Sequence, residues 1–527
     1  MSLSIASLLH QRASGILLPL FSLPGPFGIG DIGPTAFRFI DFLAQAGQCY
    51  WQILPVGPTA AAFCNSPYMS PSAFAGNPLY ISPERLVTKG LLEPGEVLVT
   101  VDAEHAVDYK QAAHLKQKLL RLAWQRFDAS PRRGELKTFI TDHPWVEDYS
   151  LFQACKKHCH NQAWFEWPKG LKKRQPEALK KIVQDYQDDV EYFTFEQYLF
   201  FSQWQELKAY GREKEVSLIG DIPMYIAADS ADAWSQQDIF QLDPATSRPT
   251  QVAGVPPDYF SKTGQLWGNP LYKWNTTKKA TKKALWKWWE ERLRHNFLLT
   301  DVVRIDHFRG FESYWSVPAE EETAINGKWK KGPGFPFFKE MKKRIGELPI
   351  IAEDLGTITP PVEKLRKDLN FPGMRILLFA FDGSPDNSYL PHWYEPNTVV
   401  YTGTHDNDTA VGWYMSPEIE EESKKQAKNY AHQTNLHESI FHQDMIYLAL
   451  SSVANTAILP MQDVLGFGND CRINTPGTVA HNWQWRCAQR FITDELASWL
   501  YDKTALFGRL PQKTVPKGIQ KVETAEP

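Results

Sequence analysis

The sequence has little cysteine and no long apolar run. Its 527 residues include six cysteines, scattered at positions 49, 64, 155, 159, 471 and 487, a pattern that does not fit a disulfide framework in a chain of this size. No uninterrupted apolar stretch has membrane-spanning length. The short apolar run 15–21 contains a proline and follows a single cation, Arg12, unlike a secretory signal. These absences predict a cytoplasmic protein without a membrane anchor.

The chain also lacks an excess of either charge. Lys and Arg number 57 and Asp and Glu 61, for a formal net charge of −4, with no sustained basic block. This balance argues against a protein that binds nucleic acid or an anionic membrane. A hydrophobic fraction of 43% excludes disorder as the main state. Aromatic residues are abundant, with 19 Trp, 20 Tyr and 30 Phe, which indicates either a large core or rings that stack on ligands.

Eight short apolar segments have the character of parallel strands that are buried on both faces. Helix-like stretches follow several of them, for example 35–46 and 284–294. The eight segments are 16–20, 51–55, 217–222, 302–306, 349–353, 374–379, 398–402 and 456–460. This alternation predicts an α/β protein with a (β/α)₈ TIM barrel, and a doubly wound sheet is the competing fold.

Insertions into one barrel account for the length of the chain. We expect a catalytic barrel over residues 1–510, with inserted subdomains at about 84–170, 223–283 and 410–450. A flexible tail is expected over 511–527. The insertion at 223–283 has the Pro and Gly content of a loop, whereas the other two contain helix-forming sequence. No C-terminal β-sandwich is expected after the eighth strand.

Acidic residues stand at the ends of three predicted strands. Asp306 ends the fourth, Glu353 ends the fifth, and Asp406 follows the seventh. Strand C-termini of a barrel meet at the catalytic face, so three carboxylates there favour chemistry over separate ion pairs. Retaining cleavage of a glycosidic bond needs a carboxylate nucleophile and a carboxylic acid about 5 Å apart. The pattern therefore fits glycosidic bond chemistry without a cofactor.

Three other interpretations have weaker support. A metal-dependent hydrolase is the alternative for the 405–408 cluster, but the first strand lacks a His-x-His pair. The segment 28–33 matches G-x-G-x-x-G without directly following its strand, which favours a glycine-shaped loop over a nucleotide site. Cys155 and Cys159 are one helical turn apart without a second pair nearby, which favours half-buried thiols over a zinc site. We expect no metal and no organic cofactor.

The strand-end segments resemble a known family. Arg304–Gly310, Ala352–Gly356 and Gly403–Asp408 are similar to signature segments of the 4-alpha-glucanotransferases, also called amylomaltases or disproportionating enzymes. These form glycoside hydrolase family 77 of the alpha-amylase clan. The resemblance runs in order from near the N-terminus to about Arg486. It includes the further segments 65–78, 220–225, 255–259, 264–270, 372–374 and 459–466.

The resemblance implies transfer of α-1,4-glucan segments from a maltooligosaccharide donor to the 4-hydroxyl of an acceptor glucan or glucose, by a retaining double displacement. It implies Asp306 as nucleophile, Glu353 as general acid and base, and Asp406 as transition-state stabiliser. It further implies substrate contacts from Tyr68, Asp221, Asp258, Trp267, Arg304, His405 and Asn474. Donor and acceptor glucans are then the expected partners, and the expected assembly is a monomer or a weak homo-oligomer.

Two alternative functions stay open, an α-glucan hydrolase of the same clan and a non-catalytic glucan-binding protein. Amylases usually carry Asn-His at the end of the third strand and Lys-His after the nucleophile. Here the third strand runs on to Tyr225 without histidine, and His307, Phe308 and Arg309 follow Asp306. This difference favours the transferase branch, and the presence of all three acids argues against a protein that has lost catalysis.

Two further expectations concern the mouth of the barrel. The segment 252–270 is expected to be a loop that closes over the mouth and excludes water. Trp267, Tyr68 and Trp51 lie in segments that are expected at the sugar-binding mouth. The segment Asn469–Cys471 departs from the family pattern, which has a Glu-small-Arg run before the position of Arg472.

Overall fold

Eight parallel strands form the centre of the computed structural model, which describes residues 9–98, 101, 103–257, 261–432 and 440–511. The strands are hydrogen-bonded in the order β10-β11-β12-β1-β2-β3-β6-β9. Their bounds are β1 Ala13–Leu17, β2 Tyr50–Gln52, β3 Ser217–Ile222, β6 Val302–Ile305, β9 Ile350–Ala352, β10 Gly373–Ile376, β11 Thr398–Tyr401 and β12 Thr456–Pro460. The Ala352 N–H donates to the Pro372 carbonyl at 2.9 Å, so that β9 approaches β10 and the ring nearly closes. The predicted TIM barrel is confirmed and the doubly wound sheet is wrong.

Each predicted strand overlaps one observed strand of the barrel. The strands could be predicted because parallel strands are covered on both faces and therefore have continuous apolar sequence. All five residues of β12, for example, are buried. β1 ends before its predicted end because Pro19 has no N–H to continue a ladder.

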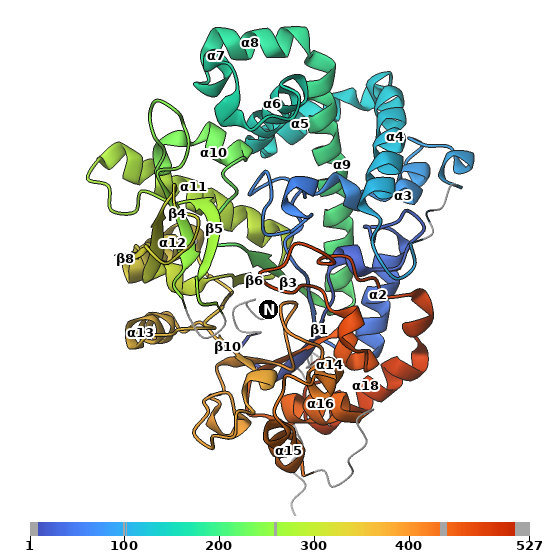
Figure 1. The fold of residues 1–527 in the computed structure, drawn as a ribbon. Helices are drawn as coiled ribbons and strands as arrows, with labels where there is room; N and C mark the ends of the chain where they lie inside the picture. Colours follow the sequence, from blue (N-terminus) through green and yellow to red (C-terminus); the bar gives the residue numbers. More distant parts are fainter. Residues whose placement is uncertain (1–8, 99–100, 102, 258–260, 433–439, 512–527) are drawn as a thin grey trace, which may run out of the picture.

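Helices surround this barrel in the drawing of the fold (Figure 1). They include α2 Pro34–Gln45, α9 Gln187–Glu213, α11 Lys279–Leu299, α12 Gly334–Ile345, α13 Pro360–Asp368, α16 Phe441–Ser451, α17 Met461–Leu465 and α18 Asp494–Leu506. The helix predicted at 284–294 is the middle of α11, where Leu285, Trp289 and Leu293 are at most 1% exposed on one face. No helix within the described ranges is both long and apolar enough to cross a membrane.

Helices also fill much of the chain between β2 and β3. They are α3 Pro83–Thr88, α4 Tyr109–Asp128, α5 Glu135–Asp142, α6 Trp145–His158, α7 Lys169–Lys172 and α8 Pro176–Asp185. In Figure 1, α5 to α8 form a layer above the barrel. Cys155 is buried in α6, and the described residues contain no His, Cys, Asp and Glu group that could hold a metal ion. The division into barrel and inserted subdomains stays a prediction.

The segment 223–283 differs from its predicted loop character. It contains α10 Ala231–Ser235 and two strands, β4 Gln251–Val255 and β5 Gln265–Pro270. With β7 Ser313–Pro318 and β8 Lys328–Lys331 these make a four-stranded antiparallel sheet in the order β5-β4-β7-β8. Gly254 permits close strand contact, since a Cβ there would lie 2.4 Å from the Gln265 carbonyl oxygen. The expectation of a closing loop over 252–270 is therefore wrong for its two ends, which are strands.

The remaining helices follow β11. They are α14 Ala410–Met415 and α15 Glu421–Tyr430, which precede α16. After β12 the described chain contains helices and no strand, consistent with the expected absence of a β-sandwich in that part. The predicted tail lies outside the described residues except for residue 511, and Asp258 lies outside them as well.

Candidate active site

Three carboxylates meet at the C-terminal ends of the barrel strands. Asp306 directly follows β6, Glu353 directly follows β9, and Asp406 lies in the loop after β11. Their charges interact, because Asp406 raises the pKa of Asp306, and Asp306 raises the pKa of Glu353. The fold thus brings together the three acids that the sequence singled out.

Arg304 on β6 connects two of the acidic side chains at the mouth. Its guanidinium donates to Asp221 Oδ2 at 2.6 Å and lies 2.9 Å from Asp306 Oδ1. The side chain of Arg304 is 4% exposed, and that of Asp221 is fully buried. A charge-assisted bond of this kind favours an ionised Asp306. Burial opposes the charge of Arg304, but the pKa of Arg304 is raised because Asp221 and Asp306 are so close.

Tyr68 joins Asp221 to His405. Its hydroxyl donates to Asp221 Oδ2 at 2.8 Å and lies 2.9 Å from His405 Nε2. The hydroxyl has one proton, so His405 Nε2 must be protonated and donate to it. The same nitrogen lies 3.3 Å from Asp406 Oδ2. The rings of Tyr68 and His405 are near-parallel with centroids 5.3 Å apart.

Two backbone N–H groups, one after β6 and one after β9, hold the carboxyl group of Glu353. The His307 N–H donates to Glu353 Oε2 at 2.7 Å, and the Leu355 N–H donates to Oε1 at 2.8 Å. His307 has φ of 53°, an uncommon left-handed conformation for a residue other than glycine. Burial and the negative charge of Asp306 nevertheless raise the pKa of Glu353 to about 7. Such a carboxyl group can hold a proton near neutral pH and give it up.

Asp306 and Asp406 have different electrostatic surroundings. Burial raises the pKa of Asp306 to about 6, against the opposing effect of Arg304. Burial alone would also raise the pKa of Asp406, but His405, the Asn474 amide and Arg304 outweigh it and lower this pKa to about 2. The Asn474 Nδ2 donates to Asp406 Oδ1 at 2.6 Å. Asp406 is therefore ionised across the neutral range, whereas the pKa values of the interacting Asp306 and Glu353 are both raised.

Trp267 lies beside the peptide that follows Asp306. The ring is half-buried on β5, and its centroid is 4.8 Å from that of His307 in an edge-to-face arrangement. Tyr225 contacts both rings at centroid distances of 6.3 and 6.2 Å. The small sheet therefore supplies one wall of the candidate site.

The loop that contains Asn469–Cys471, which departs from the family pattern, leads into Arg472, and its residues contact the loop around Asp406. Arg472 donates to the Asp406 carbonyl at 2.6 Å and forms an ion pair with Asp408. The Asn469 amide donates to Asp408 Oδ1 at 3.0 Å and accepts from the Thr409 N–H at 3.1 Å. Asn469 therefore supports Asp408 by a hydrogen bond from an uncharged amide, next to the ion pair that Arg472 forms with the same carboxylate.

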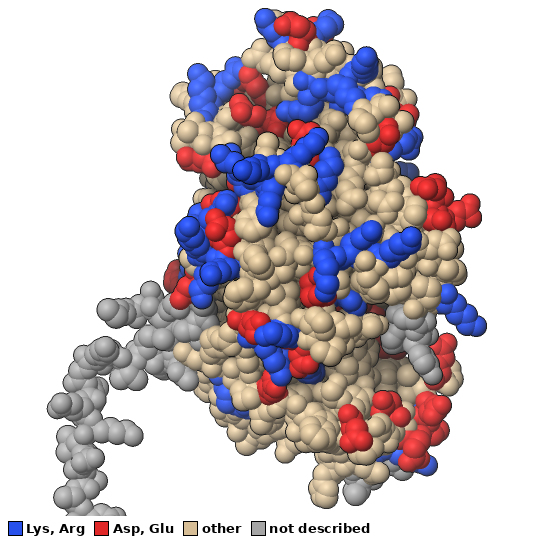
Figure 2. Space-filling view, turned by 90° about the vertical axis from the view of Figure 1, so that its left-hand side faces the viewer, with Lys and Arg blue, Asp and Glu red and all other residues tan. Residues whose placement is uncertain are grey.

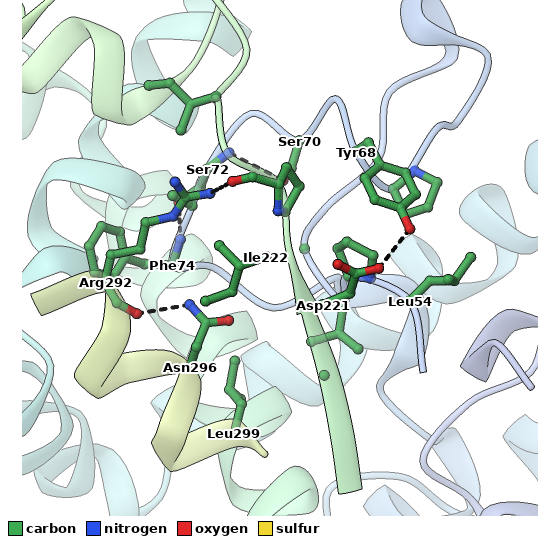
Figure 3. A pocket seen from close by; sticks show the side chains of 18 of the residues that line it. Leu54, Tyr68, Ser70, Ser72, Phe74, Asp221, Ile222, Arg292, Asn296 and Leu299 are labelled. Carbon is green, nitrogen blue, oxygen red and sulfur yellow. Dashed lines mark hydrogen bonds between the residues drawn. The ribbon is translucent and has the colours of Figure 1, made fainter. Parts of the chain in front are cut away.

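A cavity of about 60 Å³ lies next to Asp221, between the barrel and α11. Figure 3 shows the Tyr68 hydroxyl directed at Asp221, with Arg292 and Asn296 of α11 on the opposite side. The Asp221 Oδ1 has no hydrogen-bond partner among the described residues.

Two tryptophan rings, Trp51 and Trp483, lie in places that the sequence did not predict. Trp51 is in a segment expected at the sugar-binding mouth, but its ring is 0% exposed and its Nε1 donates to the Leu18 carbonyl at 2.8 Å, so the ring is part of the core. Trp483 was not predicted at the site, yet its centroid is 5.8 Å from Tyr68 and 6.0 Å from His405. Trp483 follows the last barrel strand in an irregular segment, where no periodic pattern indicates its position.

Comparisons with known proteins agree along nearly the whole chain. A sequence model described as 4-alpha-glucanotransferase matches residues 18–492. A 4-alpha-glucanotransferase from Synechocystis sp. is 48% identical over 509 residues, 95% of this chain and 99% of that protein. One from Clostridium butyricum is 46% identical over 490 residues, 93% and 99% of the two chains. The solved structure of an amylomaltase from Streptococcus agalactiae in complex with acarbose has a TM-score of 0.90 and 37% identity, covering 95% of this chain and all of that one.

Proposed function

Since the chain belongs to the 4-alpha-glucanotransferase family, glycoside hydrolase family 77, we propose that Asp306, Glu353 and Asp406 carry out its reaction. The chain is an enzyme of this family, a 4-alpha-glucanotransferase also known as an amylomaltase or disproportionating enzyme. The proposal concerns the residues, the course of the reaction and the substrates. The donor is an α-1,4-glucan such as a maltooligosaccharide, and the acceptor is a second glucan or glucose.

The first step is the formation of a covalent glycosyl-enzyme. The Asp306 carboxylate attacks the anomeric carbon of the donor, and the bond from this carbon to the glycosidic oxygen breaks. Glu353 gives its proton to the departing oxygen, which becomes the 4-hydroxyl of the leaving chain. Arg304 supports this step because its contact with Asp306 Oδ1 favours the ionised nucleophile.

The second step reverses the first with a new sugar. The 4-hydroxyl of the acceptor gives its proton to the Glu353 carboxylate while its oxygen bonds to the anomeric carbon. The ester bond to Asp306 breaks and the carboxylate is regenerated. Asp406 stays ionised throughout and stabilises positive charge on the sugar, and His405 and Tyr68 are in position to bind hydroxyls beside it.

The observation that carries this assignment is that the carboxyl groups have different partners, because Arg304 forms an ion pair with Asp306, whereas no cation among the described residues forms one with Glu353. Glu353 has a pKa of about 7, next to Asp306 at about 6 and Asp406 at about 2. Carboxyl groups with divergent pKa values mark acid and base roles. Asp221, Trp267, Arg304 and Asn474 are proposed to bind or support substrate, as is Asp258, which is not among the described residues.

Incubation with maltotriose tests the proposal. A transferase yields glucose together with a ladder of longer maltooligosaccharides, whereas the alternative hydrolase yields maltose and glucose alone. Asp306→Ala should lose transfer and Glu353→Gln should lower kcat by about 10²–10⁴-fold. Near-normal transfer by the Asp306 variant would overturn the assigned nucleophile. A glucan-binding protein without catalysis would yield no new products.

We further propose a cytoplasmic location and a monomeric or weakly associated state, without nucleic acid or membrane partners. The near-balanced charge supports the absence of nucleic acid.

A further inference from the structure

An exposed tryptophan stands near the candidate active site without a role in the steps above. Trp329 is 41% exposed and lies on β8, an edge strand of the small antiparallel sheet whose four residues are all exposed. The guanidinium of Arg309 lies 3.9 Å from the centre of its ring. A tryptophan ring that is partly exposed and held in a fixed position can stack on the apolar face of a ligand.

The position of Trp329 is fixed relative to the nucleophile. β8 pairs with β7, with Trp329 opposite Trp315, and the two ring centroids are 5.1 Å apart. The Gly332 N–H donates to the Glu312 carbonyl at 2.8 Å, just after the short helix Phe308–Phe311 that follows Asp306. A Cβ at Gly332 would lie 2.3 Å from the Phe311 carbonyl oxygen, so only glycine permits this approach. Little ordering is therefore needed when the ring binds a ligand.

The two edge strands of the sheet flank the peptide after the nucleophile. Trp267 on β5 contacts His307, and Trp329 on β8 contacts Arg309. Arg309 also donates to the carbonyl of Thr357, in the loop that follows Glu353. Glu353 is near enough to affect the pKa of Arg309, which it raises against the larger effect of burial. Trp329 therefore lies on the side of the site where Glu353 and its loop are found.

The side occupied by Glu353 is the side of the acceptor. The general acid must contact the oxygen of the departing chain, and the acceptor hydroxyl later takes the same place. Resting on the function proposed above, we propose that Trp329, supported by Arg309, is a stacking platform for the acceptor glucan beyond its reacting glucose. The reacting 4-hydroxyl belongs to the non-reducing end, so the following sugars of the acceptor extend away from the cleaved bond toward this ring.

The surface around β8 has lysines beside the ring, since Lys328, Lys330 and Lys331 are exposed and Lys331 forms an ion pair with Glu312. Figure 2 faces the side of the molecule where β8 lies in Figure 1, and it shows Lys and Arg in groups with acidic side chains among them. An uncharged glucan would find ring surface and mixed polar groups there, which are the two kinds of contact that a sugar makes.

A comparison of a short and a longer acceptor distinguishes a binding role of Trp329 from a structural one. We would measure transfer from saturating starch to radiolabelled glucose and to radiolabelled maltotriose. For Trp329→Ala the KM for maltotriose should rise about tenfold, a loss of the size expected for one ring contact. The KM for glucose and kcat should change little, because glucose does not extend to the ring. Trp329→Phe should keep most of the affinity, whereas Trp329→Leu, which keeps apolar bulk without a ring, should behave like the alanine variant.

Tyr447→Ala is the matched control, because this ring is 50% exposed on the outer helix α16 and contacts Phe507. It should change neither KM. Equal losses for glucose and maltotriose in the Trp329 variants, or no loss with either, would overturn the platform. A wild-type protein that fails to elongate any acceptor would instead overturn the proposed function and leave no transfer to compare.

Discussion

The carboxyl group of Glu353 has two backbone donors and a negative neighbour, and these act in opposite directions. The His307 and Leu355 N–H groups favour its ionised form, but burial and Asp306 favour the protonated form and raise its pKa to about 7. His307 must adopt its left-handed backbone conformation to take part in this arrangement. A strained residue next to Asp306, the proposed nucleophile, is consistent with a site shaped for chemistry rather than for stability.

These pKa values predict a bell-shaped pH dependence. The first step as proposed needs ionised Asp306 and protonated Glu353, so kcat/KM should fall as pH drops through about 6 and as pH rises through about 7. The two limbs belong to the interacting pair rather than to each residue alone. Initial rates with maltotriose between about pH 4.5 and pH 9 would give the profile. A rate that keeps rising above about pH 8.5 would contradict the role of Glu353 as acid.

Asn474 is a second residue whose effect can be measured. Its amide donates to Asp406 Oδ1, so Asn474→Ala should raise the pKa of Asp406 from its low value and reduce kcat about tenfold, as loss of a hydrogen bond to a charged group does. Asn397→Ala is the control, since this amide contacts Asn370 near the opposite end of β11. Equal kcat in the two variants would contradict a supporting role for Asn474.

At the scale of elements, the barrel strands could be predicted and the small sheet could not. Burial on both faces forces continuous apolar sequence on strands such as β12. By contrast, β8 is an edge strand with lysines at three of four positions and no buried residue, so it has no apolar pattern to recognise. Gly254 and Pro270 also suggested a loop, although the glycine is needed where two strands approach closely.

In the candidate site, too, some residues could be predicted from the sequence and others could not. Asp306 and Glu353 were found because a strand end is visible in the sequence and barrel strand ends converge. Trp483 comes from an irregular segment that only tertiary structure brings to Tyr68. Trp51 was misplaced because the sequence does not show which residues of a strand buried on both faces reach the mouth.

The sheet that supplies Trp267 should be sensitive to a single methyl group. Gly254→Ala places a Cβ at 2.4 Å from the Gln265 carbonyl oxygen, which forces β4 away from β5. We expect a loss of about 1–3 kcal/mol in unfolding free energy, typical of overpacking, together with reduced kcat because Trp267 moves. Denaturant melts and initial rates would measure both. Gly95→Ala is the control, since nothing lies within 4 Å of a Cβ there, and equal effects in both variants would refute the strand contact.

At the scale of the whole molecule, the helices between β2 and β3 share a core with the barrel. Leu119, Leu120 and Trp124 of α4 belong to the same buried cluster as the barrel strands. Lys116 of α4, with its side chain 1% exposed, forms an ion pair with the buried Asp31 ahead of α2. Such contacts couple the stability of the inserted helices to that of the barrel.

This shared core predicts a single cooperative unfolding transition. In scanning calorimetry we expect one peak, and Leu120→Ala should move that peak to lower temperature without splitting it, because removing a buried Leu side chain costs about 2–5 kcal/mol. An early separate transition that responds to Leu120→Ala, with the main peak unchanged, would show that the inserted helices unfold independently.

The pairing of β1 with β12 governs the order in which the protein can fold during synthesis. Arg509 is 0% exposed and donates to the carbonyl oxygens of Ala13 and Asn455, the first of these 496 residues away in the sequence. The first strand thus leaves the ribosome long before the strand and the arginine that complete its surroundings. Until then one edge of β1 stays open, which makes folding slow and exposes the nascent chain to aggregation. The catalytic mouth can form only when nearly the entire polypeptide has been made.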